Sequence, residues 1–533
     1  MLPVNEPNLT YLPGSPERAA LKARLSAMAS ERIEIPLIIG GQEIRTGHLA
    51  QAVMPHDHRH VLADWHRADA SHVAHAMAAA GKARADWAAS PLDERASVFV
   101  RAADLLATAW RATLNSATML GQSKTVFQSE IDAASELIDF WRFNPAFAAE
   151  IHAEHPISTE TASNRMDYRP LEGVVYAVTP FNFTSIAGNL PTAPALMGNT
   201  VVWKPAASSV LSSYYVMRIL EAAGLPAGVI NFVPGDPVEI SDLLLDSPDL
   251  AGVHFTGSTQ VFQSMWKRVG DNIGRYRTYP RLVGETGGKD FIVAHPSAAV
   301  QELAVAIARG GFEFQGQKCS AASRVYVPRS LWGDVRDRVV AMMREMRMGD
   351  VCDFRTFMGA VIDEKAFVRI SGYLDDARRN ATIVQGGVAN AQRGYFIEPT
   401  LVETSDPQYR LMREEIFGPV LTAFVYPDNE WEETLRLVDS TSPYALTGAV
   451  FSRDRAAIHR AEVILRNAAG NFYINDKPTG AVVGQQPFGG ARGSGTNDKA
   501  GSKMNLLRWV SARTIKETFS PPGDYRYDYM VEE

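Results

Sequence analysis

Cys319 is the residue of this 533-residue chain whose surroundings suit a nucleophile best. A lone cysteine is more often buried filler than a nucleophile. The stretch FEFQGQKCSAASRVYVP, however, places polar, turn-forming residues directly before Cys319, at a predicted strand–helix junction. Backbone N–H groups and a nearby cation at such a junction would favour the thiolate that attacks carbonyl carbons. The second cysteine, Cys352 in GDVCDF, lies between acidic residues that would raise its pKa, so we interpret it as structural or incidental.

A carboxylate upstream of the cysteine could act as a general base. Glu285 ends an apolar strand in RLVGETGGK, just before a glycine turn. Partial burial would raise the pKa of its carboxyl group, as a general base near neutral pH requires. The alternative is a turn residue that caps Gly287, and this motif alone favours that alternative.

The general motifs for phosphate and metal binding are incomplete. No G-x-G-x-x-G follows a strand, and Gly287-Gly288-Lys289 lacks the other residues of a phosphate loop. A bound dinucleotide would therefore not use the usual fingerprint. His56, His58 and His60 alternate as they would on one face of a strand. A metal site and an exposed β-hairpin both fit this pattern; we favour the hairpin and expect no metal, because no carboxylate or cysteine completes a ligand set.

Composition and length limit the classes of protein. A chain of 533 residues with 46% hydrophobic and 21% charged residues predicts a globular protein of two or three domains. A net charge of -7 gives no general attraction to nucleic acid or to an anionic membrane. No apolar window reaches the roughly 18 residues of a spanning helix, and the N-terminus lacks an apolar signal. Two cysteines exclude a disulfide framework and favour a reducing compartment, the bacterial cytoplasm or, in a eukaryote, the mitochondrial matrix.

The pattern of apolar residues predicts the elements that must position these groups. Residues 70–150 have mainly helical spacing. Strands are then expected at 174–178, 200–203, 229–232 and 252–255, with helices at 208–223, 238–245 and 258–269 between them. This alternation predicts right-handed crossovers and a buried parallel sheet. A second α/β region follows at about 290–480, with helices around 300–313, 331–346, 362–379 and 430–439. From 484 the chain is glycine-rich loop, followed by a strand-like piece at 505–510.

Glu285 and Cys319, 34 residues apart, resemble the active-site pair of the aldehyde dehydrogenase superfamily. Five further motifs of the superfamily follow in the right order over roughly residues 35–515: TPFNF (179–183), WKP (203–205), FTGS (255–258), EEIFGP (414–419) and PFGG (487–490). Three longer stretches resemble the pyrroline-5-carboxylate dehydrogenase branch in particular, at 130–144, 312–321 and 465–498. That resemblance implies NAD-dependent oxidation of L-glutamate γ-semialdehyde to glutamate.

The resemblance also implies a role for each catalytic residue. Cys319 attacks the aldehyde carbon, and Glu285 activates the water that hydrolyses the resulting thioester. The side-chain amide of Asn182 and the backbone N–H of Cys319 would hold the oxyanion. Without its motif, Asn182 would be read as a loop residue that bonds its own backbone.

Six residues are expected to bind NAD through the same resemblance. Lys204 would bind the adenosine ribose, the N-terminus at Gly257 and Ser258 would meet the pyrophosphate, and Glu415 would hold the nicotinamide ribose. Phe417 would pack beside Glu415, and Thr179 is also expected to bind the cofactor. Ala207 stands where NAD-selective relatives often carry an acidic residue, so NADP could also be accepted.

The expected substrate site lies around a glycine-containing turn. Gly480 and Ala481 resemble the family's anchor loop, which binds an α-carboxylate through backbone N–H groups. Four residues complete the set. Ser320 would lie near the carboxylate, and Phe183 and Phe488 would lie along the aliphatic chain, with core packing the alternative for Phe183. Glu136 would face the ammonium group or, equally, lie on a helix surface.

The implied fold is α/β, with a Rossmann-like cofactor domain, an α/β catalytic domain and a small oligomerisation flap. We expect the NAD-binding domain at 1–154 and 174–287, the catalytic domain at 288–490, and oligomerisation segments at 155–173 and 491–533. The chain would form a homodimer or a larger homo-oligomer and bind a small-molecule aldehyde, with no nucleic acid and no membrane as partners. Two alternatives stay open: another short semialdehyde, such as succinate semialdehyde, as substrate, and a catalytically silent binding protein of the same fold.

Overall fold

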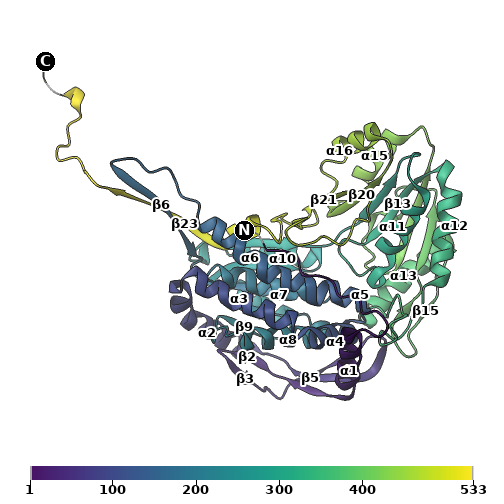
Figure 1. Ribbon diagram of the computed structural model, residues 1–533, viewed down its shortest axis with the longest axis horizontal. Helices are drawn as coiled ribbons and strands as arrows, with labels where there is room; N and C mark the ends of the chain where they lie inside the picture. The colour runs from purple at the N-terminus through teal and green to yellow at the C-terminus, as the bar shows by residue number, and fades with distance from the viewer. Residues whose placement is uncertain (1–2, 531, 533) are drawn as a thin grey trace.

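Two seven-stranded sheets form the cores of two lobes that lie side by side (Figure 1). The computed structural model describes residues 3–530 and 532. The first sheet has the order β11 (Arg281–Glu285), β10 (Leu250–Thr256), β7 (Val174–Val178), β8 (Thr200–Lys204), β9 (Ile230–Phe232), β2 (Leu37–Ile39) and β3 (Gln42–Ile44). The second has the order β14 (Thr382–Gln385), β17 (Thr400–Thr404), β18 (Val420–Tyr426), β13 (Ala322–Pro328), β12 (Asp290–Ala294), β20 (Thr447–Phe451) and β21 (Asn471–Ile474). The chain passes from the first sheet to the second between Glu285 and Asp290.

The central strands of the first sheet are parallel and buried on both faces. Strands β7, β8 and β10 expose no residue, as continuous apolar runs predict for a sheet covered on both sides. One face packs on α3 (Leu92–Ala107), α4 (Arg111–Gln122), α6 (Leu137–His152), α7 (Thr184–Leu196) and α8 (Val210–Ala222). The other face packs on α2 (Ala70–Ala89), α9 (Pro237–Leu245) and α10 (Thr259–Asp271). The predicted strands and crossover helices are confirmed, with bounds that shift by about two residues.

The second sheet is built on the same principle. Helices α13 (Glu364–Asn380), α15 (Trp431–Ser440) and α16 (Arg455–Ile464) cover one face, and α11 (Val300–Phe312) and α12 (Arg329–Glu345) cover the other. The four helices predicted for this region are confirmed. Within the described part of the chain, no helix combines the length and the apolar character needed to cross a membrane.

The remaining elements are shorter. Helix α1 (Pro16–Ser30) packs on α4. Between α4 and α6 lie α5 (Val126–Ser129) and a π-helix, η1 (Glu130–Glu136). Short segments complete the set: η2 (Ala207–Ser209), η3 (Ile273–Arg275), η4 (Glu313–Gly316), η5 (Asp528–Met530), α14 (Arg410–Arg413), β15 (Ala389–Asn390), β16 (Phe396–Ile397), β19 (Tyr444–Ala445) and β22 (Ala491–Arg492).

The histidine-rich segment is a hairpin, as predicted, but it is less exposed than expected. Strand β4 (Leu49–Met54) pairs antiparallel with β5 (Asp57–His66), and β1 (Ile33–Ile35) pairs parallel with β5. His56 is buried and lies 3.2 Å from the hydroxyl of Ser123, while His58 and His60 are half-buried and bond backbone carbonyls. One ring nitrogen of each of these three histidines therefore forms a hydrogen bond within the protein.

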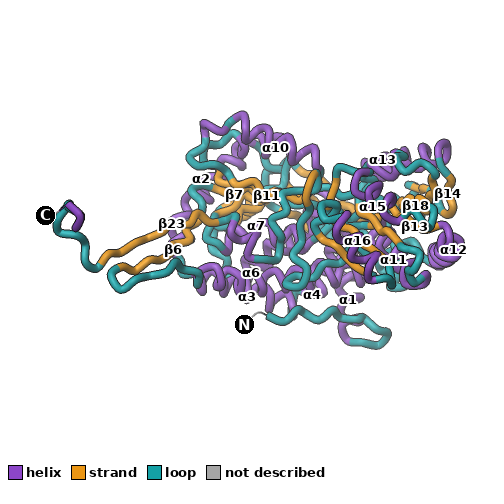
Figure 2. The backbone as a smooth tube through the Cα atoms, turned by 90° about the horizontal axis from the view of Figure 1, so that it is seen from above, coloured by secondary structure: helices purple, strands orange, loops and turns teal. Residues whose placement is uncertain are grey.

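A two-stranded ribbon projects from the first lobe (Figures 1 and 2). Strand β6 (Ala162–Pro170) pairs antiparallel with β23 (Val510–Thr518), two segments more than 300 residues apart in the chain. The strand expected at 505–510 is wrong except at its last residue: residues Lys503–Leu507 form α17, whose first turn the Ser502 hydroxyl caps by accepting from the N–H of Met504, and a turn follows the helix. The strand begins only at Val510.

Gly448 tests the packing of the second sheet. A Cβ at this position in β20 would lie 2.1 Å from the ring of Phe291, the buried residue directly opposite it in β12. We expect Gly448→Ala to destabilise the protein by about 1–3 kcal/mol, because the core must shift to accept the methyl group. The matched control is Gly372→Ala in α13, where a Cβ meets open space and helix propensity favours alanine. Thermal unfolding should show a lower Tm for the first variant and an equal or higher Tm for the second; equal falls in both would contradict this packing.

Candidate active site

Cys319 lies in the turn between η4 and β13, in a segment that buried side-chain hydrogen bonds hold in place. The preceding η4 contains Phe314 and Gln315, whose φ angles of 49° and 57° are left-handed and unusual for residues other than glycine. The Gln315 amide compensates by donating to the carbonyls of Ser123 (3.0 Å) and Ala360 (2.7 Å). The polar turn predicted before the thiol is confirmed. Its side chains are buried, so the turn is fixed by hydrogen bonds to the protein rather than to water.

The surroundings of Cys319 favour the neutral thiol. Burial raises the pKa of Cys319, and the carboxyl groups of Asp290, Glu285 and Glu415 raise it further, whereas a hydrogen bond from the Ser320 N–H lowers it. A cation was expected beside the thiol, but no cationic side chain is among the groups that shift the pKa of Cys319. Lys318 instead donates to the Glu313 carboxylate at 3.0 Å. The protein alone therefore keeps the thiol protonated, and a base must take its proton before attack. Burial and Asp350 raise the pKa of the other cysteine, Cys352, to about 12, in line with a structural residue.

Asp290 is a buried acid near the thiol that no sequence motif indicated. One carboxyl oxygen accepts from the N–H of Thr447 at 2.6 Å, and the other has no partner among the described residues. Burial raises its pKa well above the ordinary value. It follows the glycine turn in the sequence, but nothing in the sequence shows that this position packs against the cysteine turn.

Glu285 ends β11, as predicted, and faces the loop that follows β21. Its carboxylate accepts from the N–H of Gly490 at 3.1 Å. The alternative, a cap on Gly287, is wrong, because the N–H of Gly287 donates to the hydroxyl of Thr259 at 3.3 Å. Burial raises the pKa of Glu285 well above its ordinary value, and Lys499 only partly offsets this. A carboxyl group in this state can take up a proton close to neutral pH.

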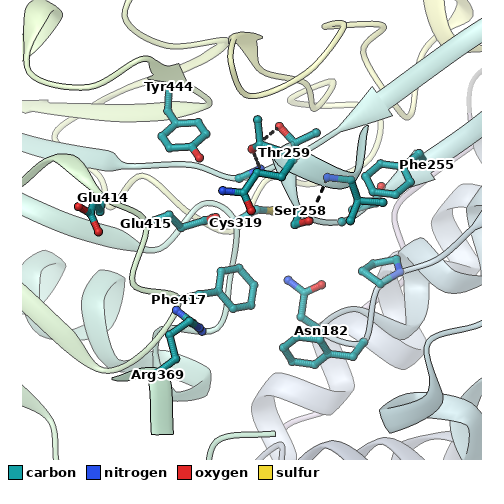
Figure 3. A pocket seen from close by; sticks show the side chains of 18 of the residues that line it. Asn182, Phe255, Ser258, Thr259, Cys319, Arg369, Glu414, Glu415, Phe417 and Tyr444 are labelled. Carbon is teal, nitrogen blue, oxygen red and sulfur yellow. Dashed lines mark hydrogen bonds between the residues drawn. The ribbon is translucent and has the colours of Figure 1, made fainter. Parts of the chain in front are cut away.

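Asn182 connects the first lobe to the cysteine turn. It is buried in the loop between β7 and α7, and its amide donates to the carbonyl of Gln317 at 3.1 Å. The alternative, a loop residue bonding its own backbone, is therefore wrong. Figure 3 shows that the side chains of Asn182 and Cys319 lie in the same pocket and come from different segments of the chain.

A cleft of about 980 Å³ opens beside Cys319 and runs between the lobes. It lies at the carboxyl ends of β7, β8 and β10, where open α/β sheets bind ligands. All six residues predicted to bind the cofactor line it, together with Asn182 and Cys319 (Figure 3). The six are Thr179, Lys204, Gly257, Ser258, Glu415 and Phe417.

The cleft offers binding groups for an anionic, hydroxyl-rich ligand. Lys204 is buried, forms no ion pair with any described residue, and has a pKa that burial lowers to about 8. The Ser258 hydroxyl accepts from the N–H of Val261, so the first turn of α10 starts at the cleft with further N–H groups free of intrahelical partners. Glu415 accepts from the N–H of Gly288 at 2.9 Å, and Phe417 packs edge-on against Phe181. These groups fit a dinucleotide without a G-x-G-x-x-G loop.

Several lining residues come from the second lobe and were missed. They are Arg369, Tyr373, Arg410, Arg413 and Tyr444. Arg369, Tyr373 and Arg410 lie on α13 and α14, far along the chain from the glycine turn, so no local signal could have assigned them to the cleft.

The predicted substrate loop is connected to the nucleophile through two hydroxyl groups. The side chains of Ser320 and Thr479 lie 2.8 Å apart, and both are buried. Gly480, which follows Thr479, is exposed and has a φ of 95°, a left-handed conformation that suits glycine. Ala481 is half-buried beside it. The loop at 479–481 therefore starts directly behind the residue that follows Cys319.

Three other predicted residues have defined surroundings. The ring of Phe183 is half-buried, with the Lys124 ammonium 4.3 Å from its centre. Phe488 is half-buried, and its backbone pairs with Ala500. Glu136 ends the π-helix η1 and accepts from the Ser185 hydroxyl at 2.7 Å; burial, then Asp132, raises its pKa to about 8. The alternative of an ordinary helix-surface charge is wrong for Glu136.

Comparisons with known proteins agree on one family. A sequence model described as "Aldehyde dehydrogenase family" matches residues 45–515. The chain is 51% identical over 535 residues to the mitochondrial Δ1-pyrroline-5-carboxylate dehydrogenase of Dictyostelium discoideum, with 99% of this chain and 96% of that protein covered. It is 50% identical over 529 residues to the mitochondrial enzyme of the same name from Homo sapiens, with 99% and 94% covered.

Two solved structures are also similar to this chain. The Δ1-pyrroline-5-carboxylate dehydrogenase of Mycobacterium tuberculosis bound with NAD superposes with a TM-score of 0.96 at 54% identity, over 100% of this chain and 99% of that one. A Thermus thermophilus 1-pyrroline-5-carboxylate dehydrogenase variant superposes with a TM-score of 0.91 at 30% identity, over 97% and 99%.

Replacing Asp290 tests the electrostatics of the thiol. In a Cys352→Ser background, we expect Asp290→Asn to lower the pKa of Cys319, because it removes a carboxylate that disfavours the thiolate. The pH at which iodoacetamide alkylation of Cys319 is half-maximal should move to lower pH. Asp353→Asn, which removes a carboxylate that does not act on this thiol, should leave the midpoint unchanged. A midpoint that stays in place for Asp290→Asn, or moves upward, would contradict this account of the site.

Proposed function

Because the chain belongs to the aldehyde dehydrogenase family, we propose that it oxidises L-glutamate γ-semialdehyde, formed by hydrolysis of pyrroline-5-carboxylate, to L-glutamate with NAD. The observation that carries the proposal is the meeting of Asn182 and the Cys319 turn at the end of a cleft that fits a dinucleotide. Relatives about half identical over nearly their whole length have names that specify this substrate.

The first chemical step is attack of Cys319 on the aldehyde carbon. The thiol must lose its proton first, and a water molecule in the cleft is proposed to accept that proton, which leaves the Glu285 carboxylate free for the later hydrolysis. The new C–S bond converts the aldehyde oxygen to an oxyanion. The Asn182 amide and the Cys319 N–H are proposed to donate to it, and losing one such donor typically lowers the rate on the order of a hundredfold or more.

The second half of the reaction releases the acid. Bound NAD supplies the acceptor for the hydride that leaves the former aldehyde carbon, so that Cys319 carries a thioester. Glu285 then takes a proton from a water molecule, the water oxygen attacks the thioester carbon, and the C–S bond breaks to give glutamate and the free cysteine. Lys204, the α10 N-terminus and Glu415 are proposed to hold the cofactor. Gly257 precedes this N-terminus, and a Cβ there would lie 2.7 Å from the Phe255 ring, so the position suits glycine.

Recognition of the substrate requires groups for both charges of its amino-acid end. The N–H groups of Gly480 and Ala481 and the Ser320 hydroxyl are proposed to bind the α-carboxylate. Glu136 is proposed to face the ammonium group, whose positive charge would favour ionisation of a carboxyl group with a pKa of about 8. Phe183 and Phe488 are proposed to flank the aliphatic chain.

Domain roles and assembly extend the proposal. The first lobe is assigned as the NAD-binding domain (1–154 and 174–287) and the second as the catalytic domain (288–490). The β6–β23 ribbon, within 155–173 and 491–533, is proposed to pair two copies of the chain, because a projecting ribbon has unpaired outer edges. A reducing compartment, bacterial cytosol or mitochondrial matrix, suits its two free cysteines.

Removal of the nucleophile tests the mechanism and the substrate together. We expect Cys319→Ala to lower kcat for pyrroline-5-carboxylate by at least about a thousandfold, because no other group can carry the thioester. Cys352→Ala, the matched control, should retain the parent kcat. NADH formation is followed with pyrroline-5-carboxylate and with succinate semialdehyde. Robust turnover by Cys319→Ala would refute the mechanism. A preference of the parent protein for succinate semialdehyde would refute the substrate assignment.

Ala207 tests the basis of cofactor choice. It is exposed at the start of η2, three residues after Lys204. We expect Ala207→Glu to lower kcat/KM with NADP roughly tenfold relative to NAD, because a carboxylate there repels a 2′-phosphate. Ala207→Gln is the uncharged control and should keep the parent's NADP/NAD ratio. Equal effects of the two substitutions would show that charge at this position does not select the cofactor.

A further inference from the structure

The N-terminal arm, residues 3–15, is bound to the elements that carry the proposed substrate groups. In both views its start lies beside α6 (Figures 1 and 2). Further along, the Leu9 N–H and the Tyr11 hydroxyl each donate at 2.7 Å to the carboxylate of Glu130, the fully buried first residue of η1. The arm is therefore fixed to the π-helix that ends at Glu136.

Asn5 forms a bridge between this helix and the anchor loop. The side-chain nitrogen of Asn5 donates one hydrogen bond to the Asp139 carboxylate on α6 and another to the carbonyl of Val483, each at 2.8 Å. The amide oxygen accepts from the Gln485 side chain at 3.0 Å. The Glu6 N–H donates to the other oxygen of Asp139 at 2.8 Å. Both donor hydrogens and the oxygen of the Asn5 amide thus form hydrogen bonds with α6 and with the loop that continues from Gly480.

The loop needs such a support because its own sequence leaves it free to move. Gly480 and Gly484 both have left-handed φ angles, and Gly484 and Gln485 are exposed. At one end the loop is held by the Thr479–Ser320 contact behind the nucleophile. At the other, Val483 is buried, and Gly484 packs so closely on Phe143 of α6 that a Cβ would lie 2.4 Å from the ring. The Asn5 amide adds a polar link that holds the Val483 end of the loop against α6.

We propose that Asn5 is a positioning residue for substrate recognition: it holds the anchor loop and the Glu136 helix at the separation that fits the amino-acid end of the substrate. This rests on the proposed function, since the loop and Glu136 are assigned there to the carboxylate and the ammonium group. Asp139 lies three residues after Glu136 and contributes to its raised pKa, so the arm contacts the same turn of helix that presents Glu136. Asn5 does not touch the cleft that fits the cofactor.

Substitution of Asn5 should therefore affect affinity for the amino-acid end and leave the chemistry intact. In Asn5→Ala the KM for pyrroline-5-carboxylate and the inhibition constant of L-glutamate should both rise about tenfold, as expected when hydrogen bonds to a buried carboxylate and a carbonyl are lost. The kcat, the KM for NAD and the kinetic constants for propanal, which has no amino-acid end, should stay at parent values. Asn5→Gln keeps the amide and should recover most of the loss.

The control is Asn8→Ala, in the same arm. Asn8 is exposed, and its side chain makes no hydrogen bond with the described residues, so every constant should match the parent. Hydrogen–deuterium exchange gives a readout independent of turnover: amides in 480–486 should exchange faster in Asn5→Ala, and those of β13 should not change.

Two results would overturn the proposal. One is an Asn5→Ala protein with parent KM and parent exchange in the loop. The other is an equal loss with propanal and with pyrroline-5-carboxylate, together with a fall in Tm, which would indicate a merely structural role. Failure of the parent protein to oxidise pyrroline-5-carboxylate would be a different result: it would refute the proposed function, and the assignment of Asn5 to substrate recognition with it.

Discussion

The hydrogen bond from the Asn182 amide to the Gln317 carbonyl joins the two lobes at the point where the chemistry must occur. Both residues are buried, so the bond is shielded from water and fixes the loop after β7 against the turn that carries Cys319. The cleft, the cysteine turn and the start of α7 all depend on this alignment. A small displacement here would separate the proposed oxyanion donor from the nucleophile, which is why the turn is also held by the Gln315 amide.

The carboxyl groups around the thiol impose the second constraint. Glu285, Asp290 and Glu415 all have raised pKa values because burial disfavours their charged forms, and each raises the pKa of Cys319 in turn. Such a cluster is costly when all its members ionise, but it favours a cation beside the sulfur. The oxidised nicotinamide ring is positively charged. The cluster is thus suited to keep the thiol protonated in the free protein and to favour the thiolate once a positive ring lies nearby.

The sequence predicted much of this because its signals were local. Continuous apolar runs identified β7, β8 and β10, and the motifs around Asn182, Glu285 and Cys319 lie directly at strand ends. Predictions were wrong where a polar side chain binds a partner that the apolar pattern does not show. A cation was expected beside Cys319, and Lys318 is its neighbour in the sequence, but the ammonium group of Lys318 donates to Glu313 instead. The strand expected at 505–510 starts as a helix whose first turn Ser502 caps, a signal that the apolar pattern of the segment obscured. The contacts of Asn5 connect positions up to 480 residues apart, and the periodicity of apolar residues cannot predict contacts at that separation.

The central claim is that Cys319 carries the acyl group and Glu285 releases it. Intact-protein and peptide mass spectrometry of Glu285→Gln, mixed with NAD and pyrroline-5-carboxylate, tests it most directly. The account predicts one burst of NADH and a glutamyl group that accumulates on the peptide containing Cys319, since attack can proceed while hydrolysis is blocked. An unmodified Cys319, a glutamyl group on Cys352, or steady turnover without accumulation would contradict it.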